Sequence, residues 1–164
     1  MILFLISISA QNFNKLKETM SYSQVLTKNV VIDLDSGSLS VSNSFNERVT
    51  IECKNITQPL NVENGEELVI KSEVTASCSL TVPRNRFIAV KGKQLNASFD
   101  RVRNDIDVNI EQGSVKFFPR RKSKYKYDLN IAGESEFEDF ISSPIDRAHQ
   151  ITINLQNGSL KKER

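Results

Sequence analysis

Two pairs of carboxylates have a spacing that could support chemistry. Asp33 and Asp35 lie two residues apart, and so do Asp105 and Asp107. Because side chains at i and i+2 of a strand share a face, each pair could belong to an acidic site for polysaccharide cleavage or for calcium. The alternation of Asp105 and Asp107 with apolar residues favours a simpler interpretation, the solvent-facing half of an amphipathic strand. Glycoside hydrolysis requires carboxyl groups about 5 to 9.5 Å apart, a separation that sequence spacing does not set.

The chain has a single histidine, His149, which limits its catalytic chemistry. It follows Asp146-Arg147-Ala148, beside loop-like sequence. One imidazole excludes sites that need several, and general-base catalysis needs a positioned partner that the sequence does not show. We therefore expect His149 to be solvated or locally hydrogen-bonded. The sequence predicts no catalytic residues, no metal site and no cofactor, and so a protein that is not an enzyme.

Cations and aromatic residues are interleaved between residues 120 and 127, the one dense patch of charge. Such interleaving is typical of sites for nucleic acids, polyanions or lipid headgroups. An exposed hairpin loop whose lysines prevent pairing at a sheet edge would have the same composition. If the patch binds a ligand, an acidic glycan or an anionic envelope surface fits it best. The candidate binding residues are Arg120, Arg121, Lys122, Lys124, Tyr125 and Lys126.

Cys53 and Cys78 are the two cysteines of the chain, and both lie in β-like runs. Without C-x-x-C spacing, zinc binding and thioredoxin-type chemistry are poorly supported. In an oxidising compartment they could form one disulfide worth about 3 kcal/mol in the chain-entropy model. The alternative is two buried thiols.

The length of 164 residues suits one domain, and the 22 basic and 20 acidic side chains nearly cancel. No large positive field is present to attract DNA or RNA, so a nucleic-acid partner is not expected. The apolar run from Ile2 to Ile8 is too short to span a membrane, which takes about 20 helical residues. Followed by Ser9 and Ala10, it is read as a signal-peptide remnant over 1–10, with one domain over 11–164. A first buried strand is the alternative.

Alternation of apolar and polar residues recurs from about residue 30 to the end and predicts an all-β fold. Weak helical patterns over 13–20 and 136–141 would be appendages. Three segments repeat a strand, a Gly-Ser corner and a second strand; they begin at Val30, Ile106 and Ile151, with glycines Gly37, Gly113 and Gly158. These units suit the rungs of an irregular single-stranded parallel β-helix-like solenoid, or the hairpins of an antiparallel β-sandwich.

From residue 80 the pattern resembles a known family. Leu80-Thr81-Val82-Pro83 precedes Phe87-x-x-Val90-x-Gly92 and Leu95-x-Ala97, and then comes the repeat that starts at Ile106. Over about residues 25 to 160 this is similar to the putative adhesin family of bacterial envelopes, a domain of unknown function similar to auto-transporter adhesin heads.

The resemblance implies an exported β-solenoid, periplasmic, secreted or in the cell envelope, with no established activity. We therefore expect a non-enzymatic adhesin-like module with a binding or structural role and a surface polysaccharide or envelope component as partner. The alternative is a carbohydrate-active enzyme with acids on one solenoid face. The corners read Gly-Ser where the family has Ser-Gly-Asp, so the rungs need not stack regularly.

Overall fold

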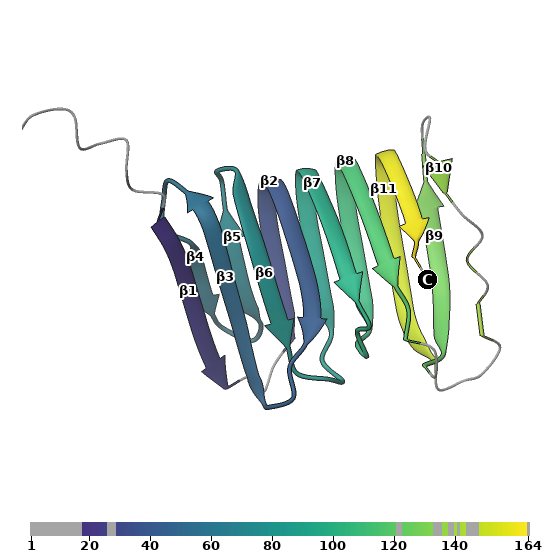
Figure 1. Ribbon diagram of the computed structural model, residues 1–164, viewed down its shortest axis with the longest axis horizontal. Coiled ribbons are helices and arrows are strands. Elements are labelled where there is room, and N and C mark those ends of the chain that lie inside the picture. Colours follow the sequence, from purple (N-terminus) through teal and green to yellow (C-terminus); the bar gives the residue numbers. More distant parts are fainter. Residues whose placement is uncertain are drawn as a thin grey trace, which may run out of the picture.

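The described residues of this computed structural model form eleven strands and no helix, which confirms the all-β prediction. They are residues 18–25, 29–120, 123–132, 136–137, 140, 142–143 and 148–163. All eleven strands belong to one mixed sheet that does not close on itself (Figure 1). The strands are β1 (Glu18–Val25), β2 (Val30–Asn43), β3 (Arg48–Ile56), β4 (Asn61–Asn64), β5 (Leu68–Ser72), β6 (Ala76–Val82), β7 (Ile88–Asp100), β8 (Ile106–Phe118), β9 (Tyr125–Ile131), β10 (Glu136–Phe137) and β11 (His149–Lys162).

The centre of the sheet is a stack of parallel strands. β2, β7, β8 and β11 lie side by side in that order, each paired in parallel with the next. β5 and β6 continue the stack, because β5 pairs with the first half of β2 and β6 with its second half. Figure 1 draws β2, β7, β8 and β11 as long bent strands that follow one another, from blue at β2 to yellow at β11. We call each of these long bent strands a rung. The pairs β1–β3, β3–β6 and β4–β5 are antiparallel and lie at the N-terminal end of the stack.

Each Gly-Ser corner of the sequence repeat lies inside one long strand rather than between two strands. Gly37, Gly113 and Gly158 have φ of 122°, 145° and 146°, a backbone region that glycine adopts without steric cost. The alternation of buried positions shifts at each corner; in β2 it passes from Leu34 to Leu39. The strand therefore changes direction while its apolar side chains keep facing one core.

The core consists of rows of apolar side chains that repeat from rung to rung. Ile32, Val90, Val108 and Ile153 occupy one such row and are fully buried. Each rung thus buries its apolar face against the next, which adds about 1.5 to 3 kcal/mol for a Val, Leu or Ile removed from water. The rungs hold one another in register by this repetition.

Aromatic side chains fill the C-terminal end of the core. The Phe117 ring meets the rings of Tyr125 and Tyr127 edge-on at 5.2 and 5.9 Å between centroids, and Phe140 covers Tyr127 at 4.9 Å. Burial raises the pKa of the Tyr127 hydroxyl, with a smaller contribution from neighbouring Tyr125. Contacts between aromatic rings therefore pack this end of the core.

Both helical predictions fail where the structure can test them. Residues 18–20 open strand β1, which pairs with β3 and so gains a ladder of hydrogen bonds that outweighs weak helical propensity. Glu136 and Phe137 form β10 on the edge of β11. The remaining residues of the two predicted helices lie mostly outside the described residues, as does the predicted signal segment 1–10. The described residues contain no helix long and apolar enough to cross a membrane.

Asn104, in the loop after β7, forms hydrogen bonds with the loop after β6 and with the end of β2. It is fully buried, and its Nδ2 donates to the carbonyls of Pro83 at 2.9 Å and Arg86 at 2.7 Å. Its Oδ1 accepts from Nδ2 of Asn43, whose own Oδ1 accepts the backbone N–H of Arg103 at 2.7 Å. The amide therefore ties the end of β2 and the loops after β6 and β7 to one another.

Replacing Asn104 with alanine is expected to lower the free energy of unfolding by about 2 to 3 kcal/mol, because the buried carbonyl of Pro83 and the part-buried carbonyl of Arg86 lose their donor. Urea unfolding measures this loss. Asn109→Ala, at an exposed position of β8, is the control and should change stability by less than about 0.5 kcal/mol. Equal effects of the two changes would contradict a structural role for the buried amide.

Candidate functional site

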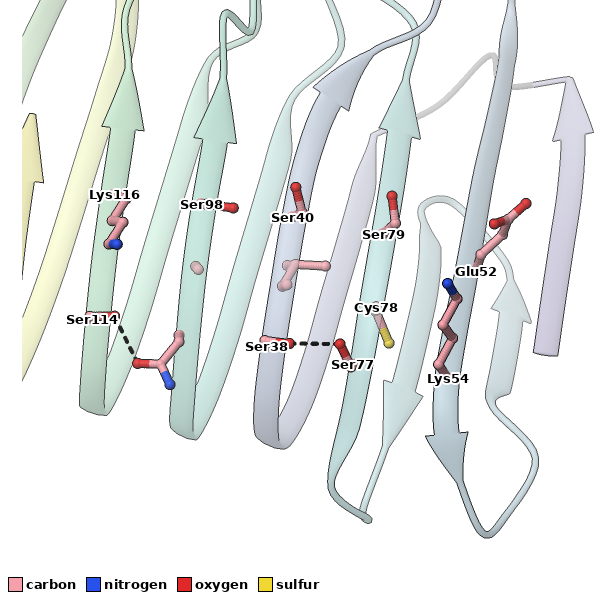
Figure 2. A pocket seen from close by; sticks show the side chains of 13 residues that line it. Ser38, Ser40, Glu52, Lys54, Ser77, Cys78, Ser79, Ser98, Ser114 and Lys116 are labelled. Carbon is pink, nitrogen blue, oxygen red and sulfur yellow. Dashed lines mark hydrogen bonds between the residues drawn. The ribbon is translucent and has the colours of Figure 1, made fainter. Parts of the chain in front are cut away.

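Small polar residues line the outward side of the stack along the C-terminal halves of its strands, and we call this surface the serine face (Figure 2). It forms because the inward positions Leu39, Cys78, Ala97 and Val115 alternate with outward hydrophilic ones. The same residues line a shallow groove with a volume of about 800 Å³. The serine face comprises Ser38, Ser40, Glu52, Lys54, Ser77, Ser79, Asn96, Ser98, Ser114 and Lys116.

The hydroxyls of the serine face stand in two rows across the rungs. The first row contains hydrogen bonds of its own: Ser38 with Ser77 at 2.9 Å, and Ser114 donating to Asn96 Oδ1 at 2.7 Å. The second row consists of Ser79, Ser40 and Ser98 and then Lys116. Within the described part of the chain, these three serines make no hydrogen bond through their side chains. Neighbouring strands are about 4.8 Å apart, so the second row offers free hydroxyls at that interval.

Charged residues lie toward both sides of these rows. Glu52 and Lys54 of β3 flank one side, and Lys116 of β8 lies on the other, all exposed. The described residues of the groove include no histidine, so no hydroxyl there has an imidazole base beside it. The arrangement therefore favours hydrogen bonding to an extended polar ligand over nucleophilic chemistry.

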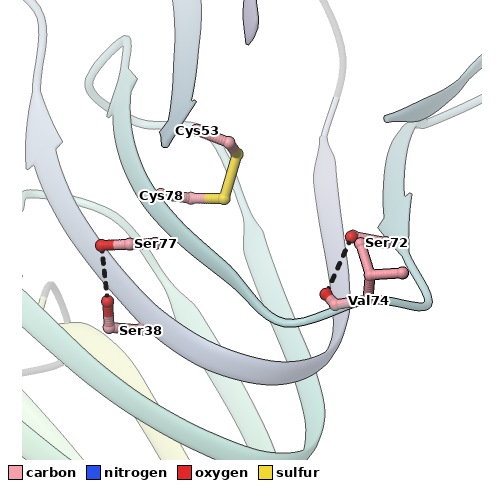
Figure 3. Close-up of a disulfide and its surroundings, with 6 residues drawn as sticks. All are labelled: Ser38, Cys53, Ser72, Val74, Ser77 and Cys78. Carbon is pink, nitrogen blue, oxygen red and sulfur yellow. Dashed lines mark hydrogen bonds between the residues drawn. A yellow bond between two sulfur atoms is a disulfide. The ribbon is translucent and has the colours of Figure 1, made fainter. Parts of the chain in front are cut away.

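Cys53 of β3 and Cys78 of β6 are joined by a disulfide on the inner side of the serine face (Figure 3). They oppose each other directly in the antiparallel pair, with Cα atoms 4.1 Å apart. The two residues are buried, with exposures of 0% and 4%. The bond ties the ribbon of β1 and β3 to the parallel stack, and it leaves no thiol for redox or nucleophilic chemistry.

The carboxylate pairs found in the sequence do not adjoin, because β7 lies between β2 and β8. Asp35 forms an ion pair with Lys93 at 3.0 Å, and the hydrogen bond, ahead of the charge of Asp35, raises the pKa of Lys93. Asp105 accepts the backbone N–H of Gln150 at 2.9 Å and lies 3.7 Å from Nδ1 of His149. The geometry thus gives Asp35 and Asp105 partners from neighbouring rungs. No group of three or more metal-ligating side chains occurs among the residues described.

The predicted basic cluster is divided by the fold. Tyr125 is 5% exposed, because its ring packs in the aromatic end of the core and its hydroxyl donates to the Val102 carbonyl at 2.9 Å. That burial leaves the Tyr125 ring no surface for a ligand. Lys124 and Lys126 are exposed, and Arg120 lines a separate groove described below. Arg121 and Lys122 lie outside the described residues. Ligand binding by this cluster stays a prediction.

Sequence reasoning missed the serine face, although a signal for it is present. Serine or threonine alternates with apolar residues over 38–42 and 77–81, and Asn-Ala-Ser at 96–98 continues the pattern. Read along one strand, such alternation marks only a half-buried strand. The face emerges once the register places these segments side by side.

Among comparisons with known proteins, one solved structure shares the fold at low sequence identity. No protein-family model matches the sequence, and no curated protein matches it significantly. A putative cell adhesion protein from Clostridium sporogenes is similar in structure with a TM-score of 0.53 and 10% identity, over 89% of this chain and 100% of that chain. A putative adhesin from Parabacteroides distasonis has a TM-score of 0.28 and 8% identity, over 89% and 97%. A putative adhesin from Bacteroides fragilis has a TM-score of 0.29 and 9% identity, over 90% and 98%.

Proposed function

We propose that this protein is a non-enzymatic, adhesin-like β-solenoid module that binds polysaccharide outside the cytoplasm, at the cell envelope or surface. The observation that carries the proposal is the serine face with its row of hydroxyls that have no hydrogen-bond partner among the described residues. A hydroxyl both donates and accepts, so such a row can pair with the hydroxyls of an extended sugar chain without selecting a charge. The repeat of rungs supplies several equivalent contacts along one ligand.

The architecture supports the solenoid part of the proposal. Four long strands pair in parallel and in register, and each bends at the same place. An antiparallel sandwich, the alternative from the sequence, is built from hairpins, whereas the antiparallel pairs among the described strands all lie at the N-terminal end. The similarity in fold to a protein that bears a cell-adhesion name supports the adhesin-like part of the proposal. It is also consistent with membership of the adhesin family that the sequence resembles.

A location outside the cytoplasm is supported by the Cys53–Cys78 bond. Disulfides persist in oxidising compartments and are rare where glutathione and thioredoxin keep thiols reduced. The apolar segment at residues 1–10, read as a signal-peptide remnant, fits the same location. Alkylation of the protein from fractionated native cells, denatured with and without reduction, tests this: Cys53 and Cys78 should react only after reduction, in an extracytoplasmic fraction. Two free thiols in a cytoplasmic fraction would overturn the location.

The triple variant Ser40→Ala, Ser79→Ala, Ser98→Ala should bind polysaccharide about tenfold more weakly, a loss of about 1.4 kcal/mol in binding free energy. Its stability should be unchanged, because these hydroxyls make no hydrogen bond to any residue that the structure describes. Binding is measured on an array of neutral bacterial polysaccharides and then by calorimetry. The control is the double variant Thr152→Ala, Asn154→Ala. These residues lie in the N-terminal half of β11, away from the serine face. Turnover of a polysaccharide, or equal losses in both variants, would contradict the proposal.

A further inference from the structure

A second concave site lies at the edge of the sheet where the parallel strands end. Because β2, β6, β7 and β8 run parallel, the loops that follow them leave the sheet on one side, the lower edge in Figure 1. A groove of about 740 Å³ opens between these loops. We call it the loop-edge groove. Its lining includes Phe45, Arg84, Asp100, Arg101, Phe118 and Arg120.

The loop-edge groove brings together three arginines that are far apart in the sequence. Arg84 follows β6, Arg101 follows β7 and Arg120 follows β8. One carboxylate is present, that of Asp100, which lies 3.4 Å from Nε of Arg101 in a largely exposed pair. Three guanidinium groups against one carboxylate give the groove a formal charge of +2. Guanidinium forks bind carboxylate and phosphate oxygens in pairs, so the groove fits an oxyanion.

Phe45 gives the loop-edge groove an exposed aromatic wall. It is 96% exposed, the highest value among the large exposed apolar side chains of the described residues. The guanidinium of Arg84 lies 5.6 Å from the centre of its ring and covers part of one face. An apolar ring held open to solvent beside cations suits a ligand with both an apolar face and a charge.

Arg101 is held in a backbone conformation that disfavours arginine. Its φ is 50°, in the left-handed region where glycine or asparagine is usual. Its backbone N–H donates to the Phe118 carbonyl at 2.8 Å, which fixes this conformation on the neighbouring rung. Strained residues of this kind cluster at functional sites. Here the strain accompanies a guanidinium that is presented to the groove.

The floor beneath these side chains is anchored. Asn43 lines the groove, and through Asn104 it is part of the buried hydrogen-bond network that ties the corner loops together. The backbone N–H of Arg120 donates to the hydroxyl of Tyr125 at 3.2 Å, itself buried in the core. Arg101 and Arg120 therefore stand on hydrogen-bonded backbone, an arrangement that reduces the ordering a ligand would have to impose.

We propose that the loop-edge groove binds an acidic polysaccharide, with its carboxylate or phosphate oxygens on Arg84, Arg101 and Arg120 and the apolar face of a sugar ring on Phe45. The groove is separate from the serine face and adds a charge-selective contact to it. It contains Arg120 of the predicted basic cluster and extends that cluster to two arginines and a phenylalanine from other rungs. The choice of a glycan over other polyanions rests on the proposed surface function.

Calorimetric titration of the full chain at low and physiological ionic strength tests the proposal with two probes. Oligogalacturonate presents carboxylates and a glycerol-phosphate polymer presents phosphates, so the preferred probe identifies the source of the oxyanion. Arg84→Gln and Arg101→Gly should each weaken binding about tenfold, and Phe45→Ala by several-fold. The affinity should fall as salt rises, because the cations are exposed. Arg101→Gly should leave the melting temperature unchanged or raised, since glycine relieves the backbone strain.

Two control variants separate this proposal from its rivals. Lys91→Gln removes one exposed positive charge on β7 outside the groove and should leave the affinity unchanged. The triple serine variant alters the serine face and not the groove, so it should weaken the binding of these probes by less than Arg101→Gly does. A loss with Lys91→Gln equal to that with Arg101→Gly would overturn the groove in favour of general charge attraction. Loss confined to the serine variant would move the ligand to the serine face and leave the proposed function standing.

The remaining outcomes concern the class of ligand. Equal affinity for polyglutamate or single-stranded DNA would overturn the assignment to a glycan, because it would mean that charge alone is recognised. Failure of both acidic polymers to bind the wild-type protein would overturn the loop-edge site, even where neutral polysaccharides bind the serine face. Binding of one acidic polymer that is weakened by the arginine and phenylalanine variants, not by Lys91→Gln, and less by the triple serine variant, supports it.

Discussion

Gly158→Ala is expected to destabilise the protein by about 4 kcal/mol, among the largest effects of a single substitution. An added Cβ would lie 1.7 Å from the carbonyl oxygen of Gly113 on the neighbouring rung, and that oxygen belongs to the backbone and cannot swing aside. The φ of 146° adds strain for any side chain. Gly113→Ala should behave alike, because its Cβ would meet the Leu95 carbonyl oxygen at 2.0 Å. Urea unfolding followed by circular dichroism measures the loss.

Gly65→Ala is the matched control for this prediction. A Cβ at Gly65 meets nothing within 4 Å, so this change should alter the free energy of unfolding by less than about 0.5 kcal/mol. A variant at Gly158 that folds as stably as the one at Gly65 would mean that the rungs are not packed backbone against backbone at the corner. In that case the stacking of the three Gly-Ser repeats would be wrong.

The same corner marks the limit of what the sequence could predict. Three Gly-Ser repeats predicted three like units, and the register places them in β2, β8 and β11. The fourth long strand, β7, has Leu95 where its neighbours have Gly37 and Gly113. A search for repeated glycines therefore overlooked this rung. Leu95 does not have the positive φ of those glycines, and its side chain is buried in the core, so packing replaces the glycine signature there.

The two candidate surfaces were hidden from the sequence for another reason. The serines come from four strands and the arginines from three loops, and only the parallel register places them together. At Tyr125, nearness in sequence misled in the opposite direction. Tyr125 stands among cations in the chain, but as the first residue of β9 its ring turns into the core. Where a charged segment enters a strand, the alternation of the strand turns every second side chain away from the surface, and local composition does not show this.

Reduction of the Cys53–Cys78 bond is expected to lower the free energy of unfolding by about 3.5 kcal/mol in the chain-entropy model, given a separation of 25 residues. Because both cysteines are buried, a reductant should act slowly until the β3–β6 pair opens. Urea unfolding with and without reductant measures the difference. The Cys53→Ala, Cys78→Ala variant is the control: it should be less stable than the oxidised protein, and a reductant should not destabilise it further.

The position of the bond also predicts where the loss is felt. β1 contacts the rest of the sheet through β3, and β3 reaches the parallel stack through β6, where the disulfide lies. The parallel strands β8 and β11 lie on the other side of β2 and β7. Reduction should therefore raise amide hydrogen exchange in β1 and β3 first and leave β8 and β11 protected, since local opening follows the weakest attachment. Uniform loss of protection would mean that the ribbon and the stack unfold as one unit and that the bond stabilises the whole sheet.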